Sequence, residues 1–310
     1  MVAALLLIAA AAPWLAPYDP AEQLDPPPSL YRPPGTALAA VHLASGDWRL
    51  ADRVRRTPGG LEIERLGRVE TLPAAQVQNL TPGGVADRRL FLLGSDRFGR
   101  DLLSRMLYGA RVSLAVGLIS VLLSLTVGVA VGSIAALGGR LVDMVVMRGV
   151  DAILAFPWLF LMMGLAAFLG PGTWKTVAIL GFTAWTGISR LTRAELLGLK
   201  DREFAVAARA IGEHPLRILW RHLLPNAFTP VLIQATLLIG NLILLESSLS
   251  FLGMGIQPPT PSWGNLIAEG RDILGQAWWV SAFPGAAIAV TVIAFNLLAD
   301  GLRDRLDPRS

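Results

Sequence analysis

The sequence predicts an all-α membrane protein with six membrane-spanning helices and one extramembrane insert. Hydrophobic residues make up 53% of the 310 residues and charged residues only 16%, against about 25% charged in a typical soluble domain. The uncharged residues gather in runs long enough to cross a bilayer. Short arginine-rich segments separate several of these runs, as cytoplasmic loops do. Together these observations favour a multi-span membrane protein over a soluble one.

The composition excludes several kinds of chemistry. The chain has no cysteine, so it forms no disulfide, thiolate metal site or thiol nucleophile. Its three histidines supply no metal-ligand cluster, and we expect no cofactor and no catalytic residue. The net charge of +4 comes largely from arginines that flank apolar runs, and nucleic-acid binding is therefore not expected.

The first predicted element is a membrane helix over residues 1–18, because Val2 to Tyr18 is uncharged and just long enough to span. A cleaved signal peptide is the alternative, since Ala10 to Ala12 could serve as a cleavage site. No basic segment precedes the apolar run, however. We therefore expect this helix to be retained.

Residues 19–93 are predicted to form an extracytoplasmic insert with a stiff, proline-rich start. Apolar and polar residues partly alternate in Val41 to Leu50 and in Leu61 to Leu72, which indicates strands. The pairs Gly59–Gly60 and Gly83–Gly84 are turn signals. A small β-rich domain is the preferred interpretation, and a disordered loop is the alternative.

Residues 94–111 are predicted to be an interfacial segment with an amphipathic helix. The transmembrane core, 112–300, follows and begins with an uncharged span from Val112 to Gly139. On one face of this span small residues recur at every fourth position: Ser120, Ser124, Gly128 and Gly132. Small residues let helix backbones approach closely. This face is expected to pack against another helix, either of this chain or of a partner.

Four further spans are predicted in the core: Ala152 to Trp174, Thr176 to Ser189, Ala227 to Phe251 and Trp278 to Ala299. A short basic turn, Gly139 to Arg148, precedes the first of these, and Pro157 is expected to kink it. Arg148 and Asp151 are expected to form an ion pair at its start. The second reaches membrane length only if Lys175 and Arg190 extend toward the interfaces.

Glu246 lies toward the far end of the span from Ala227 to Phe251. An acid at membrane depth is a functional candidate by default, so Glu246 is a candidate residue of a transport path. Ser247, Ser248 and Ser250 offer hydrogen bonds nearby and favour the alternative, a structural role.

The stretch from Asp201 to Asn226 lies between two apolar runs and is polar enough to lie in water. Two short helices are expected, the first capped by Asp201 and ended at Gly212, the second begun at Pro215 and ended by Pro225 and Asn226. Four residues share one narrow face of the first helix: Phe204, Ala207, Ala208 and Ile211. Two amphipathic helices on the membrane surface would give the same pattern.

Seven residues of this stretch form a recognisable motif: Ala207, Ala208, Gly212, Ile218, His222, Leu224 and Pro225. They resemble the EAA loop of ABC importer permeases, although Val206 stands where that motif has its acid. The resemblance implies a cytoplasmic coupling loop over 193–225, whose first helix docks on an ATPase subunit. The implied docking residues are Glu203, Phe204, Ala207, Ala208, Arg209, Ile211, Gly212 and His214.

Two further segments resemble permeases of the dipeptide, oligopeptide and nickel branch. Before the second span the match lies in Asp96, Gly99, Arg100, Asp101, Ser104, Arg105, Gly109 and Arg111. After the fifth span it lies in a longer set: Ser248, Leu249, Ser250, Phe251, Leu252, Gly253, Gly255, Gln257, Pro258, Pro259, Pro261, Trp263, Gly264, Glu269 and Arg271.

The resemblance implies the fold of a type I ABC importer permease and the role of the second, C-type permease of a pair. Its implied partners are another permease, two ATPase subunits that hydrolyse ATP, and an extracytoplasmic substrate-binding protein. The implied cargo is a peptide or a related small solute such as a nickel complex. The expected location is the bacterial cytoplasmic (inner) membrane. If the six spans alternate, the arginines of 140–148, 190–221 and 303–305 all fall on one side, which the positive-inside rule makes cytoplasmic, so both termini, including the tail 301–310, are expected in the cytoplasm.

Two other functions remain as alternatives, a secondary transporter and a membrane scaffold that transports nothing. Inverted repeats with broken helices and midplane charges would favour a secondary transporter, and the sequence shows neither. The segment from Gly170 to Thr176 superficially resembles a phosphate-binding loop but has Trp174 where glycine is required. Energy is therefore expected from ATPase partners.

Overall fold

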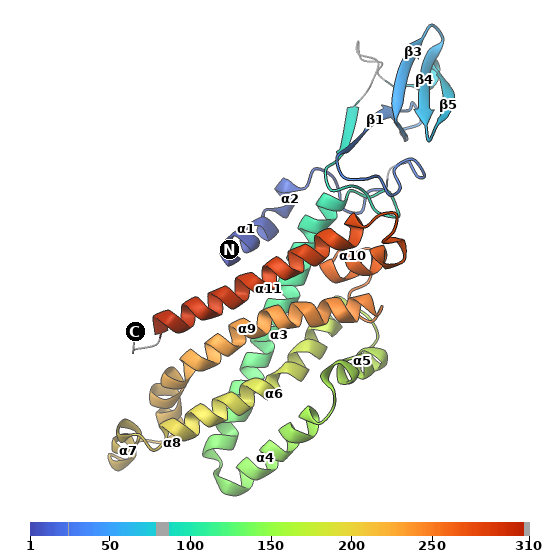
Figure 1. The fold of residues 1–310 in the computed structure, drawn as a ribbon. Coiled ribbons are helices and arrows are strands. Elements are labelled where there is room, and N and C mark those ends of the chain that lie inside the picture. Colours follow the sequence, from blue (N-terminus) through green and yellow to red (C-terminus); the bar gives the residue numbers. More distant parts are fainter. Residues whose placement is uncertain (24, 79–86, 307–310) are drawn as a thin grey trace. The chain divides into compact units, whose positions relative to one another are not determined.

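The computed structural model describes residues 1–23, 25–78 and 87–306, and most of them are helical (Figure 1). The chain divides into two compact units. One comprises Met1–Leu6, Val112–Gln257 and Ile288–Ser310, and the other comprises Leu7–Arg111 and Pro258–Ala287. The unusual division reflects two long helices, each of which contributes to both units.

The insert consists of two antiparallel three-stranded sheets. The first has the order β2-β1-β6 and the second β3-β4-β5. The strands are β1 (Thr36–His42), β2 (Trp48–Ala51), β3 (Arg53–Thr57), β4 (Gly60–Arg65), β5 (Arg68–Pro73) and β6 (Asp87–Phe91), with the 3-10 turn Ala74–Gln76 after β5. The β-rich interpretation is therefore confirmed. The turn expected at Gly83–Gly84 lies outside the described residues.

Each of the two alternating stretches forms a hairpin. Ala40 pairs with Leu50 across the β1–β2 hairpin, and Leu61 pairs with Leu72 across the β4–β5 hairpin. Leu61 and Ile63 are buried, and the glutamates between and after them are not. Through this period-two pattern Leu61, Ile63 and Leu72 of the second sheet share one apolar cluster with Val41 and Ala51 of the first sheet.

The helices begin with α1 (Val2–Ala10) and α2 (Ala12–Leu15), which stand where one spanning helix was expected. The others are α3 (Leu102–Leu137), α4 (Gly139–Leu154), α5 (Trp158–Leu169), α6 (Thr173–Leu199), α7 (Glu203–Ala210), α8 (Pro215–Ile218), α9 (Leu224–Phe251), α10 (Trp263–Gly270) and α11 (Trp279–Leu306). A π-helical turn, Leu219–Leu223, joins α8 to α9, and a 3-10 turn, Arg271–Ile273, follows α10.

Three helices of the described chain are long and apolar enough to cross a membrane: α3, the continuous stretch Pro215–Phe251, and α11. The pair α4 and α5 would make a fourth span, although the two are bent by 86° at their break. Six spans were expected. That count stays a prediction, since α1 has only nine residues and α6 is not among the apolar helices of sufficient length and composition.

Two boundaries differ from expectation, whereas the bend expected at Pro157 is present. The interfacial segment is not separate, because α3 begins at Leu102 and runs without interruption into the span. The basic turn expected from Gly139 to Arg148 is instead the first part of the 16-residue helix α4. The break before α5 falls at Pro157, whose ring cannot continue a helix.

The charged residues near this break also pair differently from expectation. Among the described residues no ion pair joins Arg148 to Asp151. Arg193 of α6 instead holds Asp143 of α4 with two hydrogen bonds, one of them 2.5 Å between Nη2 and Oδ2. This bidentate contact ties α4 to α6.

Candidate functional site

The predicted coupling loop folds onto the chain's own helices. On α7 the side chains of Ala205 and Ala208 are buried, with exposed fractions of 1% and 6%. They join a compact apolar cluster contributed by α3, α6, α8, the π-helical turn and α9: Ala136, Leu196, Ile218, Leu219, Leu223 and Ala227. The loop is therefore a packed element with a defined inner side and a defined outer side.

This packing corrects one predicted docking residue. Ala208 was assigned to the face that meets a partner, but it points into the cluster just described. The other implied docking residues are all exposed: Glu203, Phe204 (38%), Ala207, Arg209, Ile211, Gly212 and His214. Val206, at 48%, and Ile211, at 83%, are large apolar side chains left open on the outer side.

The helix ends of the loop agree only partly with expectation. Arg202, not Asp201, is the N-cap of α7, and its side chain makes no capping hydrogen bond. Gly212 does end the helix in the left-handed region, at φ +80°, with its N–H donating to Arg209 O at 3.0 Å. Pro215 starts α8 as expected.

The second helix does not stop at Pro225. Pro225 occupies the first turn of α9, where a missing N–H is tolerated. The coupling loop is thus continuous with α9 through the π-helical turn. A contact that the sequence analysis did not single out closes the loop: His222 Nε2 lies 3.0 Å from Glu213 Oε2.

The small-residue face of α3 packs against α6 of the same chain. Ser120 Oγ donates to Val177 O at 3.3 Å, and Ser124 Oγ donates to Gly181 O at 2.9 Å. A Cβ at Gly128 would lie 2.7 Å from Ile188, and one at Gly132 would lie 2.6 Å from Ser189 O. Of the two partners left open by the sequence, the structure places a helix of this chain there.

Glu246 is fully buried in α9. Its Oε1 accepts a hydrogen bond of 2.7 Å from Ser250 Oγ, which in turn accepts one of 3.1 Å from Ile256 N. Ser247 Oγ lies 3.5 Å from the other carboxyl oxygen. These contacts fasten the turn after α9 and favour the structural role over the path role.

A buried ion network gathers the arginines and acids of the two branch-specific segments. Arg100 Nε lies 2.7 Å from Asp96 Oδ2, and Arg100 Nη2 lies 3.0 Å from Glu269 Oε2. Arg105 contacts both acids, with Nη1 2.5 Å and Nη2 3.1 Å from the two oxygens of Glu269. All four side chains are at most 4% exposed. Two positive and two negative charges balance, as a buried network requires.

Asp101 stands next to this network and starts α3. Its Oδ2 accepts hydrogen bonds of 2.7 Å from both Ser104 N and Ser104 Oγ. Burial raises the pKa of the Asp101 carboxyl, while the two bonds from Ser104 act in the opposite direction.

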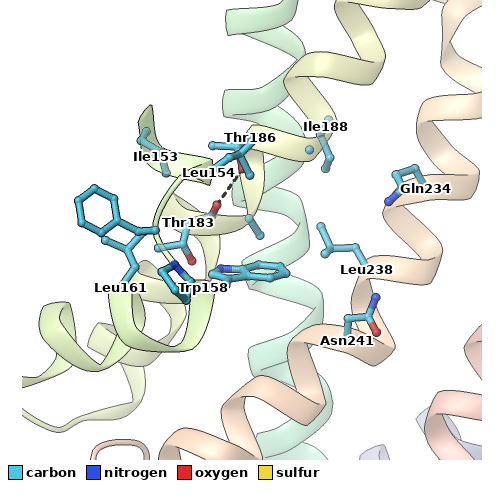
Figure 2. Close-up of a pocket in the computed structure, with 14 residues that line it drawn as sticks. Ile153, Leu154, Trp158, Leu161, Thr183, Thr186, Ile188, Gln234, Leu238 and Asn241 are labelled. Carbon is cyan, nitrogen blue, oxygen red and sulfur yellow. Dashed lines mark hydrogen bonds between the residues drawn. The ribbon is translucent and has the colours of Figure 1, made fainter. Parts of the chain in front are cut away.

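A cavity of about 390 Å³ lies between the α4–α5 break, α6 and α9. Figure 2 shows Trp158 and Leu161 on one side of it and Gln234, Leu238 and Asn241 on the other. Among the described residues that line it, Gln234 and Asn241 carry the amide side chains. The sequence analysis missed this cavity, although two amides seven residues apart in an apolar run were a usable signal.

Comparison with known proteins agrees with this arrangement. Residues 128–310 match the family described as binding-protein-dependent transport system inner membrane component. The chain is 38% identical over 298 residues to the di/tripeptide transport system permease protein DppC of Pseudomonas aeruginosa, covering 96% of this chain and 82% of that one. It is 43% identical over 219 residues to a protein named as a peptide permease in Brucella ovis, covering 70% and 72%.

Solved structures show the same fold. The inward-facing MetNI methionine ABC transporter aligns with a TM-score of 0.56 and 20% identity over 66% of this chain and 95% of that one. An amino acid ABC transporter crystallised with histidines aligns with a TM-score of 0.52 and 15% identity over 66% and 95%. At these identities the likeness concerns the fold alone.

Proposed function

The chain belongs to the family of binding-protein-dependent transport system inner membrane components, and on this premise we propose that it forms part of the peptide path of a bacterial ABC importer. One observation carries the proposal: the similarity to a di/tripeptide permease extends over 96% of the chain. The apolar helices α3, 215–251 and α11 suit a permease that crosses the inner membrane several times.

The proposed complex contains this chain as the C-type permease, a second permease, two ATPase subunits and an extracytoplasmic binding protein. ATP is hydrolysed on the ATPase subunits and not on this chain. Both termini face the cytoplasm. This orientation is supported by arginines in α4, in the coupling loop and at the end of α11, which fall on one side if six spans alternate.

The proposed contact with an ATPase subunit is the outer side of α7, formed by Phe204, Val206, Ala207 and Ile211. All four are exposed, three of them large and apolar. An exposed apolar surface beside charged residues is typical of an interface with another protein. The inner side of α7 is fixed by Ala205 and Ala208, so force applied to the outer side would reach α3 and α9.

Two adjacent alanines separate docking from folding. Ala207→Arg adds a charge to the outer side and should leave the chain folded. It should cost the complex at least about 2 kcal/mol, as a central interface residue does, which is roughly thirtyfold in affinity. Ala208→Arg places the same charge in the buried cluster and should lower the amount of the chain in the membrane.

The measurement is co-purification of the ATPase subunits with each variant, together with membrane abundance. Arg217→Ala, at an exposed position of α8, is the control and should retain the ATPases. If Ala207→Arg purifies with a full complement of ATPase subunits, the docking surface is not on this side of α7.

The whole function is tested by reconstituting the complex in liposomes with its binding protein and labelled trialanine. Uptake should require ATP and should vanish when this chain is left out. Uptake driven by a proton gradient without ATP would identify a secondary transporter instead. Failure of the complete assembly to move any peptide would favour the scaffold.

A further inference from the structure

Helix α9 carries a polar stripe along its exposed side. Between residues 231 and 250 only four side chains are exposed: Gln234, Asn241, Leu244 and Ser248. Three of the four are polar, and these three follow one another at intervals of seven residues. Residues seven apart lie on the same face of a helix, so Gln234, Asn241 and Ser248 lie in one row along this face.

The two amides of the stripe have unused hydrogen-bonding capacity. In the part of the chain that the structure describes, neither the Gln234 nor the Asn241 side chain has a hydrogen-bond partner. Ser248 differs, since its Oγ donates to Leu244 O at 2.9 Å. An amide carries two donors and one acceptor oxygen, and facing lipid it would leave all of them unsatisfied. The stripe therefore needs a polar environment at membrane depth.

The cavity supplies a place for that environment. Gln234 and Asn241 border it together with Leu238 (Figure 2), while Thr183 and Thr186 line it from α6. Both threonine hydroxyls donate to backbone carbonyls of their own helix and can still accept a hydrogen bond, whereas each of the two amides can both donate and accept. The volume of about 390 Å³ lies within the usual range of small-ligand sites, about 300–1,000 Å³.

The chemistry of this wall suits a peptide backbone. None of the described residues that line the cavity is ionisable, so this wall does not select charged side chains. An amide side chain can accept from a peptide N–H and donate to a peptide C=O. Gln234 and Asn241 are about 10 Å apart along the axis at 1.5 Å per residue, which is the length of about three extended residues.

We propose that Gln234 and Asn241 line the translocation path of this permease and bind the backbone of a passing peptide of about three residues. The inference rests on the proposed function and adds to it the residues that contact the cargo. Trp158, 38% exposed on the opposite side of the cavity, provides an apolar surface for the peptide side chains.

Accessibility to water is the first test, and it exploits the absence of cysteine in this chain. Asn241→Cys in the assembled, reconstituted importer should react with a charged, membrane-impermeant thiosulfonate reagent, read on this subunit by mass. Trialanine with ATP and binding protein should slow the reaction. Ile293→Cys, at an exposed apolar position of α11, is the control and should react slowly with or without trialanine.

Transport is the second test. Gln234→Leu and Asn241→Leu keep the size of the side chain and remove its hydrogen bonds. Each should raise the KM for trialanine about tenfold, which corresponds to one hydrogen bond of about 1.4 kcal/mol. The ATPase subunits should still co-purify with each variant. Gln234→Asn should recover part of the loss.

Three results would overturn the inference. Unchanged trialanine KM in both leucine variants would show that the amides do not meet the peptide. Loss of the second permease from the purified complex would show that the stripe packs against another subunit. If Asn241→Cys reacts with the thiosulfonate as slowly as Ile293→Cys does, the stripe lies away from water. Uptake by the wild-type complex is measured first. If that complex moves no peptide, the proposed function is refuted, and this outcome is distinct from a failure of the inference about Gln234 and Asn241.

Discussion

Replacing Glu269 by leucine should destabilise the chain strongly, because it leaves positive charge buried without a partner. Glu269 pairs with both Arg100 and Arg105, and Asp96 is the other acid of the network. Without Glu269, two buried guanidinium groups share one carboxylate. Removing one partner of a buried ion pair costs about 3–5 kcal/mol.

The informative variant is the double one. Glu269→Leu combined with Arg105→Met removes one charge of each sign and leaves Arg100 paired with Asp96, 2.7 Å apart. Apolar replacements of a buried ion pair are often close to neutral. The double variant should therefore be more stable than Glu269→Leu alone, by about 2 kcal/mol or more.

Thermal unfolding of the purified chain in detergent, followed by resistance to trypsin, measures the effect. A loss of 1 kcal/mol lowers Tm by about 2–4 °C in a chain of 150–250 residues, so Glu269→Leu should lower Tm by at least about 5 °C. Asp272→Ala, in an exposed ion pair with Arg271, is the control and should change Tm little. Additive losses in the double variant would refute the balance of charges as the reason for the network's stability.

Three other predictions concern packing, orientation and energy supply. Gly132→Val should lower Tm by several degrees, because the added Cβ would meet Ser189 O and an overpacked contact costs about 1–3 kcal/mol. Gly149→Val is the control and should leave Tm unchanged, because no atom lies within 4 Å of a Cβ there. In intact spheroplasts a thiol introduced by Ser45→Cys should react with an impermeant reagent and one introduced by Arg217→Cys should not, and the reverse pattern would contradict cytoplasmic termini. The purified chain alone should not retain ATP at millimolar concentration in equilibrium dialysis.

Local sequence pattern was sufficient where one element decides the structure. The alternation in Leu61 to Ile63 became a strand with a buried and an open side, and Gly212 ended α7 at positive φ as a C′ residue does. The four-residue repeat of small side chains on α3 likewise predicted a close helix contact. The partner, α6, was not readable, because spacing on one helix says nothing about which other helix meets it.

Long-range charge pairing was outside the reach of the sequence. Arg148 and Asp151 stand three residues apart and were expected to pair. The ion pair formed in this region instead joins Asp143 to Arg193, fifty residues away. The ion network is similar, since Glu269 and Arg105 are 164 residues apart. Proximity along the chain favours exposed pairs that contribute little, whereas buried charges pair with whatever the fold brings to them.

Ala208 shows why periodicity alone mistook the docking side. A spacing of three and four residues places Phe204, Ala207 and Ala208 near one another on a helix, but it does not say which edge of that face turns inward. On an eight-residue helix the boundary between inner and outer side falls between neighbouring residues, and here it falls between Ala207 and Ala208. The inner edge is decided by Ala136, Leu196 and the turn after α8, none of which a helical pattern can report. Hence Ala207→Arg should cause loss of the ATPase partner, whereas Ala208→Arg, one residue later, should cause loss of the fold.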